Sequence, residues 1–137
     1  MPGASGRRSS IVGSVPGLSQ RLVRWMEPIQ IVEQFGQAWG AHDLESTLAL
    51  VTDDCVFEAT GPAPDGVRSQ GRAEIEEAWR PIFDDKDSRF EAEETFSAGD
   101  RVVQCWRYDW DGGHVRGVDL FRVRDGKVAE KLSYVKG

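Results

Sequence analysis

The chain has 137 residues, of which 39% are hydrophobic and 29% are charged, and this composition is typical of one globular domain with a core. Its formal net charge of −6 argues against a nucleic-acid partner, because binding phosphates needs a concentrated cationic face. No apolar run approaches the ~20 residues that a membrane-spanning helix requires, so we expect no membrane partner either.

The first 25 residues differ in character from the rest of the chain. They are rich in Gly, Ser and Arg and lack the continuous apolar stretch of a secretory signal peptide. We therefore expect a flexible N-terminal arm over residues 1–25 and a single folded domain over residues 26–137, with Met26 as an alternative start.

The chain has two cysteines, Cys55 and Cys105, and each lies in an apolar, strand-like run. Neither belongs to a CxxC motif or to a cluster of Cys and His, so we expect two free thiols and no metal site. Free thiols fit a reducing cytoplasm.

Hydrophobic periodicity predicts three helices. Apolar residues recur at helical spacing over residues 27–39, where Pro28 occupies the first turn. Asp43 is a suitable cap for a short helix over residues 44–51, which we expect to end at a turn over residues 52–54. A strand over residues 55–60 and a Pro/Gly-rich loop follow. The third helix is predicted over residues 71–83, with Pro81 kinking it or marking its last turn.

The remaining sequence reads as strands separated by short turns. Four strands are predicted, over residues 88–97, 101–110, 114–123 and 128–135. Strict alternation in the first of them places Phe90, Ala92, Glu94 and Phe96 on one face. The order of elements predicts an α+β domain in which helices cover one side of a curved antiparallel sheet.

One residue stands out in this pattern. Asp119 lies in the middle of an otherwise apolar strand, and a buried carboxylate is costly unless it is paired, hydrogen-bonded or protonated. Because side chains alternate along a strand, Asp119 shares a face with Gly117 and Phe121.

Three stretches carry a resemblance to a known family: "FGQAWGAHDLESTLALVTDDCVFEA", "GRAEI" and "RGVDLFRVRDGKVAEKLSYV". Over residues 27–137 the chain resembles the nuclear transport factor 2-like superfamily and, within it, the SnoaL-like domains. This resemblance implies a cystatin-like α+β barrel: a cone-shaped, curved antiparallel sheet wrapped around three N-terminal helices and an apolar pocket. It also implies a homodimer formed through the outer face of the sheet.

The resemblance gives Asp119 a candidate role. In the related ketosteroid isomerases the matching acid is protonated and donates a hydrogen bond to an oxyanion, and in SnoaL-type polyketide cyclases it acts as an acid/base. The isomerases' tyrosine and base are replaced here by Phe35 and Ala59. Isomerisation of steroids by that mechanism is therefore not expected.

Limonene epoxide hydrolases offer a second comparison. Their Arg-x-Asp pair resembles Arg107 and Asp109, but Ser133 stands where they have a second catalytic aspartate. The catalytic array of that family is therefore incomplete in this chain, although Asp119 is a possible substitute on the neighbouring strand.

These comparisons define a candidate site. The resemblance places Asp119, Phe121 and Ser133 inside the cone. It suggests Arg107 and Asp109 there as well, with Lys131 as a further candidate. The predicted catalytic residues are Asp119, Asp109 and Arg107, and the predicted substrate-binding residues are Phe35, Trp39, Phe57, Trp79, Phe121 and Ser133. Two carboxylates near cations in a partly dry pocket can act as acid and base.

The leading hypothesis is an enzyme of the acid/base isomerase, cyclase, dehydratase or epoxide hydrolase type, which needs no cofactor and acts on an apolar small molecule. The alternative is a non-catalytic ligand-binding or dimeric interaction module, in which Asp119 forms a structural salt bridge with Lys131 or Arg107.

Other residues have simpler interpretations. Arg107 and Asp109 are equally well read as a surface ion pair, and His114 as an exposed turn residue. The run "EAEE" over residues 91–94 is typical of a solvated strand edge, although Glu94 is a candidate to face inward. Alternation suggests an aromatic stripe on the outer sheet face, which would suit a dimer interface, made of Trp106, Tyr108 and Trp110.

Overall fold

The computed structural model describes residues 26–137, and the arm predicted over residues 1–25 lies outside this part of the chain. In chain order the elements are helices α2 (Pro28–Gly40) and α3 (Leu44–Leu48), strands β1 (Val51–Glu58) and β2 (Arg68–Gln70), helix α4 (Arg72–Asp84), and strands β3 (Arg89–Ala98), β4 (Arg101–Trp110), β5 (Gly113–Arg124) and β6 (Lys127–Val135). All three predicted helices and all four predicted C-terminal strands are present, whereas the short strand β2 was not predicted.

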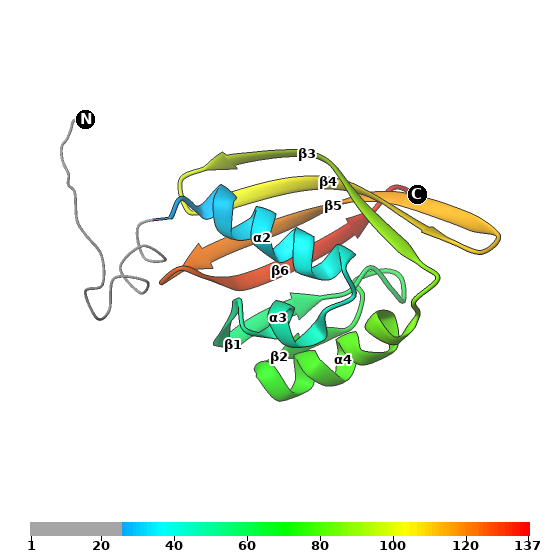
Figure 1. The fold of residues 1–137 in the computed structure, drawn as a ribbon, viewed down its shortest axis with the longest axis horizontal. Helices are drawn as coiled ribbons and strands as arrows, with labels where there is room; N and C mark the ends of the chain where they lie inside the picture. Colours follow the sequence, from blue (N-terminus) through cyan, green and yellow to red (C-terminus); the bar gives the residue numbers. More distant parts are fainter. Residues whose placement is uncertain (1–25) are drawn as a thin grey trace.

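The strands form one curved, open sheet of six strands in the order β2-β1-β6-β5-β4-β3. Helix α2 crosses the sheet, and α4 packs beside β1 and β2 (Figure 1). The α+β cone predicted from the sequence is confirmed. The sheet is nevertheless mixed rather than antiparallel, because β1 pairs in parallel with β6. These two strands lie far apart in the sequence, so no local sequence pattern predicts that they pair.

Helix α2 begins as its sequence predicts. Glu27 and Gln30 form a capping box, in which each side chain accepts a hydrogen bond from the other residue's backbone N–H, and Pro28 occupies the first helical turn. Ile31, Val32 and Phe35 are buried along one face of the helix. This apolar stripe holds α2 against the sheet.

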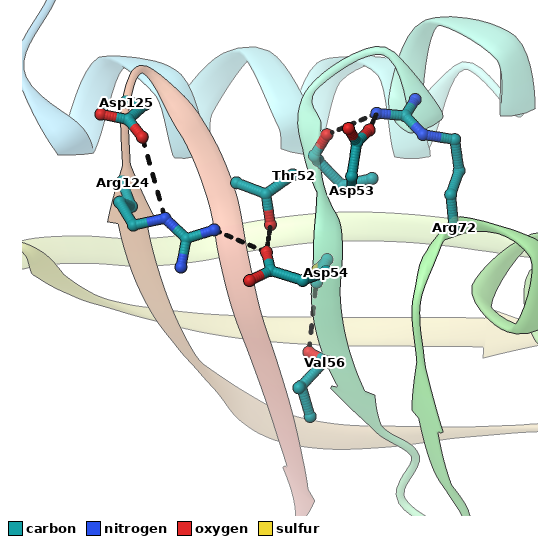
Figure 2. Close-up of polar contacts among 9 residues, drawn as sticks. Thr52, Asp53, Asp54, Val56, Arg72, Arg124 and Asp125 are labelled. Carbon is teal, nitrogen blue, oxygen red and sulfur yellow. Dashed lines mark hydrogen bonds and ion pairs between the residues drawn. The ribbon is translucent and has the colours of Figure 1, made fainter.

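Helix α3 ends earlier than predicted, at Leu48. Near this end Arg72, from the first turn of α4, reaches across to β1 (Figure 2). Its guanidinium donates to the carbonyl oxygens of Leu48 (2.7 Å) and Val51 (2.9 Å) and pairs with Asp53 at 3.1 Å. The carbonyl of Leu48, the last residue of α3, thereby has a hydrogen-bond partner from outside its own helix. The predicted turn over residues 52–54 is wrong, because these residues belong to β1.

A second polar contact ties β1 to the end of β5, which lies two strands away in the sheet. Arg124, at the end of β5, donates to Asp54 at 2.5 Å, and Thr52 donates to the same carboxylate at 2.8 Å (Figure 2). The hydrogen bond from Arg124 is the largest cause that lowers the pKa of Asp54, and the hydrogen bond from Thr52 is the next. The contact joins residues 70 positions apart in the sequence.

The edge strand β3 contains a register shift between Ala92 and Glu94. Before the shift, Phe90 and Ala92 lie opposite inward-facing residues of β4. After it, Glu94 and Phe96 lie opposite outward-facing residues, and Phe96 is 49% exposed. The prediction that all four residues share one face is therefore wrong, because a β-bulge reverses the alternation. Glu94 does not face inward, and the whole run over residues 91–94 is exposed, as expected.

The core is dominated by aromatic rings between the helices and the sheet. Neighbouring ring centroids lie 4.8–6.3 Å apart in the cluster formed by Phe35, Trp39, Phe57, Trp79, Phe83 and Phe121. Most of these contacts are edge-to-face, which aromatic pairs favour. Full burial of each large side chain contributes on the order of 1.5–3 kcal/mol to stability. Within residues 26–137, no helix has the length and apolarity needed to cross a membrane.

Candidate functional site

A cavity of about 260 Å³ lies between the inner face of the sheet and the helices. Its walls are mostly apolar and include one pair of opposite charges; the lining residues are Trp39, Phe57, Ala59, Thr60, Ile82, Phe90, Trp106, Tyr108, Val115, Asp119, Lys131 and Ser133. An apolar pocket with a few convergent polar groups is the usual form of a small-molecule site. Larger grooves along α4 and between α2 and β3 contain no buried ionisable side chain.

Asp119 and Lys131 form a buried ion pair in the wall of this cavity. Lys131 Nζ lies 3.1 Å from Asp119 Oδ2, and the side chains are only 7% and 3% exposed, respectively. Lys131 is one of the two alternative partners that the sequence suggested for Asp119; the other, Arg107, pairs elsewhere.

Lys131 is held by polar and aromatic contacts. Its ammonium group donates to Ser133 Oγ at 2.9 Å and lies 4.6 Å from the ring centroid of Trp39 and 5.0 Å from that of Phe57. Aromatic faces attract a cation, most strongly where water is excluded. The charged nitrogen is therefore placed directly against the apolar wall of the cavity.

Two buried polar atoms in the lining residues have no hydrogen-bond partner among the described residues. They are Asp119 Oδ1 and Trp106 Nε1. One is an acceptor and the other a donor, and leaving such groups unpaired costs about 1–3 kcal/mol each. The site therefore has unused hydrogen-bonding capacity of both kinds.

The register of the β4–β5 hairpin determines which side chains surround Asp119. The two-residue turn places Trp110 opposite Gly113, and counting back along the strands places Gln104 opposite Asp119. Cross-strand partners lie on the same face of a sheet, so every second residue from Gln104 also faces the cavity. These residues include Trp106 and Tyr108.

Arg107 and Asp109 consequently lie on the opposite face of β4 from the cavity. The prediction that they share the Asp119 face is wrong, because alternation alone defines two faces without saying which one is buried. They bind each other instead, with Arg107 Nε 2.7 Å from Asp109 Oδ1 and side chains 36% and 33% exposed. This is the surface ion pair that the sequence also allowed.

The predicted substrate-binding residues divide into two groups. Trp39, Phe57 and Ser133 line the cavity. The other three lie behind the cavity wall in the aromatic core and are at most 1% exposed: Phe35, Trp79 and Phe121.

Sequence reasoning missed several cavity residues, among them Trp106, Tyr108 and Val115. The signal that could have found them is the short turn "DG" at Asp111 and Gly112, since a two-residue hairpin loop fixes the pairing of the strands around it.

The outer face of the sheet also differs from the prediction. The expected aromatic stripe is wrong, because Trp106 and Tyr108 face the cavity. The outer face instead has an apolar band that crosses four strands, in which one row of paired residues is Phe96, Val103, Leu120 and Leu132 and the next includes Cys105, Val118 and Tyr134. We call this set the outer apolar band.

The two thiols are free, as expected. Burial, the largest cause, raises the pKa of Cys55 to about 12 from its ordinary value of 9.0. Among the described residues there is no group of three or more His, Cys, Asp or Glu side chains suited to a metal ion.

The fold and the site together define an α+β cone with a small apolar pocket that contains a carboxylate and an ammonium group. The profile of the SnoaL-like domain matches residues 32–131, and the chain belongs to this family. Comparison with curated proteins gives no significant match.

Three solved structures illustrate the likeness. An NTF2-like protein of unknown function from Mesorhizobium loti is 39% identical, with a TM-score of 0.74 over 91% of this chain and 98% of that one. Rv0760c from Mycobacterium tuberculosis, in complex with estradiol-17β-hemisuccinate, is 28% identical, with a TM-score of 0.67 over 80% and 94% of the two chains. A protein named as a candidate ketosteroid isomerase from Kribbella flavida is 15% identical (TM-score 0.68; 80% and 78% covered) and shares the fold.

Proposed function

We propose that this domain is a small-molecule enzyme of the isomerase or cyclase type that uses Asp119 as an acid/base next to a carbonyl group, without a cofactor. The observation that carries the proposal is the buried ion pair of Asp119 and Lys131 in the wall of an otherwise apolar cavity. A carboxylate can take a proton from the carbon beside a carbonyl, and an adjacent cation stabilises the negative charge that forms on the oxygen.

Stability alone is a weak reason for this pair. Removing two charges from water costs several kcal/mol per ion, and replacing a buried pair with apolar residues is often neutral or stabilising. Asp119 also has an acceptor, Oδ1, with no hydrogen-bond partner within residues 26–137. Charged groups that are expensive to bury and that line a pocket are candidates for function.

The size of the cavity limits the substrate. Its volume of about 260 Å³ is just below the ~300–1,000 Å³ of common ligand sites. A compact, largely apolar molecule with one polar group fits this volume and lining. The steroid hemisuccinate bound by the mycobacterial relative also combines an apolar body with a polar end, which supports the same substrate class.

The test is exchange of the hydrogens beside a ketone in deuterated water, with the bicyclic ketone 2-tetralone as the probe and mass spectrometry as the readout. The wild type is expected to accelerate exchange over buffer. Asp119→Asn keeps the size of the side chain but removes the proton-accepting carboxylate, so the rate should fall by about 10²–10⁴-fold. Asp109→Asn is the matched control, because Asp109 lies on the opposite face, and its rate should equal that of the wild type.

The outcomes separate the alternatives. Binding of the probe is followed by quenching of tryptophan fluorescence, since Trp39 and Trp106 line the cavity. Probe binding without any exchange would assign the domain to the ligand-binding class instead. A loss of exchange in Asp109→Asn but not in Asp119→Asn would contradict the role of Asp119.

We also propose that two copies of the chain associate through the outer apolar band. Phe96 and Tyr134, at the two ends of the band, are 49% and 54% exposed. A contiguous apolar patch that is exposed in a monomer is typical of an interaction surface. Ion pairs border the band on both sides, Arg122 with Asp100 and Arg116 with Glu93, as in the polar rim of an interface. The wild type should sediment as a dimer and Leu120→Lys as a folded monomer; a wild-type monomer at micromolar concentration would refute the interface.

A further inference from the structure

The chemistry of the cavity extends beyond a single acid/base. From the contacts of Lys131 we propose that its amino group forms a covalent imine with the carbonyl carbon of the substrate, so that the substrate class is an apolar aldehyde or ketone. This inference rests on the function proposed above and deepens it, since it assigns the nucleophile and the electrophile.

The position of Lys131 is the first argument. Its side chain is 7% exposed, and its nitrogen lies against the faces of Trp39 (4.6 Å) and Phe57 (5.0 Å). Both rings line the cavity. A flat apolar carbonyl compound that packs on these rings brings its carbonyl group next to the nitrogen. A buried lysine in apolar surroundings is the usual setting for imine formation in proteins.

The contact with Asp119 is the second argument, because an ammonium group cannot attack until it gives up a proton. Asp119 Oδ2, at 3.1 Å, is the nearest base and is suited to accept that proton. The neutral amine then adds to the carbonyl carbon and forms a carbinolamine. Asp119 returns the proton to the carbinolamine hydroxyl, which leaves as water.

The overall step balances: one ammonium and one carbonyl compound give one protonated imine and one water, and Asp119 ends as a carboxylate. Its second oxygen, Oδ1, has no partner among the described residues and is suited to accept a proton from the carbon beside the imine. Ser133, which accepts from Lys131 at 2.9 Å, holds the nitrogen in place. The iminium replaces the ammonium as the partner of Asp119, so the pair keeps its charges.

The experiment traps the imine. Full-length protein is incubated with 2-tetralone and sodium cyanoborohydride, which reduces an iminium to a stable secondary amine, and the modified lysine is located by peptide mass spectrometry. Lys127 and Lys136 are exposed lysines nearby and serve as internal controls. We expect Lys131 to be labelled about tenfold or more faster than either, because the cavity holds the probe beside it.

Two variants complete the test. Asp119→Asn should slow the trapping at Lys131 while probe binding, measured by fluorescence, persists. Lys131→Arg keeps the charge but cannot form the adduct, so it should bind the probe and lose exchange. Labelling confined to the exposed lysines while the probe is bound would overturn the inference. If Lys131→Arg still exchanges the hydrogens of 2-tetralone and Asp119→Asn does not, the imine is refuted while the acid/base function stands.

Discussion

Replacing Lys131 by Met tests the description of the buried pair most directly. In the folded protein Asp119 Oδ2 has Lys131 as its ion-pair partner, and Oδ1 has none among the described residues. The variant would leave a carboxylate that is 3% exposed and that has no polar partner in the described part of the chain. Removing one member of a buried pair costs about 3–5 kcal/mol. For a domain of this size, that corresponds to a fall in melting temperature of roughly 10–20 °C.

The reverse deletion should cost less. Asp119→Leu leaves the ammonium of Lys131 with its hydrogen bond to Ser133 and with two aromatic faces. The double variant Asp119→Leu/Lys131→Met removes both charges and should recover most or all of the lost stability, because apolar replacement of a whole pair is often neutral or stabilising.

The assay is urea unfolding of the wild type, the two single variants and the double variant, analysed as a double-mutant cycle. The surface pair supplies the control cycle: Arg107→Met and Asp109→Leu should each change the free energy of unfolding by about 1 kcal/mol or less. The reasoning is refuted if Lys131→Met lies within about 1 kcal/mol of the wild type, or if the double variant is less stable than Lys131→Met.

Three further predictions concern packing, thiol chemistry and pH. Gly117→Ala should lower the free energy of unfolding in urea by about 1–3 kcal/mol, because the added methyl group would overlap the carbonyl oxygen of Tyr134. In the monomeric variant Leu120→Lys, whose outer apolar band is uncovered, a thiol reagent at pH 8 should modify Cys105 and leave Cys55 intact, since burial raises the Cys55 pKa to about 12; the same shift should make stability fall between pH 9 and 12. Asp54 has a lowered pKa, so its contribution should be present above its ordinary value of 3.8 and disappear as the pH falls below it, which unfolding of Asp54→Asn across pH measures.

Each of these has a control in the same chain. Gly40→Ala should be neutral or stabilising, because a methyl group at this helical position meets its nearest neighbour at 3.7 Å. Both thiols should react in urea; rapid modification of Cys55 in buffer would contradict its burial. The control for Asp54 is Asp65→Asn, at an exposed aspartate with no ion pair among the described residues, and an equal effect at both aspartates would argue against the contact between Asp54 and Arg124.

The sequence predicted the fold well because its periodic signals are local. Apolar spacing located the three helices, and Asp119 was recognised as buried because its neighbours in the strand are apolar. The parallel pairing of β1 with β6 could not be predicted in this way, since it joins segments that no short pattern connects. The end of α3 was also missed, because the side chain that donates to its last carbonyl, that of Leu48, is Arg72 from another helix.

The site was predicted less completely, for a different physical reason. Alternation assigned Arg107 and Asp109 to one face of β4, but the choice of the buried face depends on the register with β5. That register follows from the turn at Asp111 and Gly112, because a two-residue hairpin loop fixes which residues of β4 and β5 pair. In β3, the bulge after Ala92 moves the following residues to the opposite face of the sheet, and no residue type in this stretch predicts a bulge.

The two edge strands of the sheet affect how this protein behaves when concentrated. One edge strand, β2, has three residues, and the other, β3, is interrupted by a bulge and carries negative charges within residues 91–94. Both devices discourage strand-by-strand growth between molecules. Association through a face of the sheet forms a closed dimer, whereas pairing between edge strands can add further molecules without limit. The protein should therefore resist fibril formation even in crowded solution.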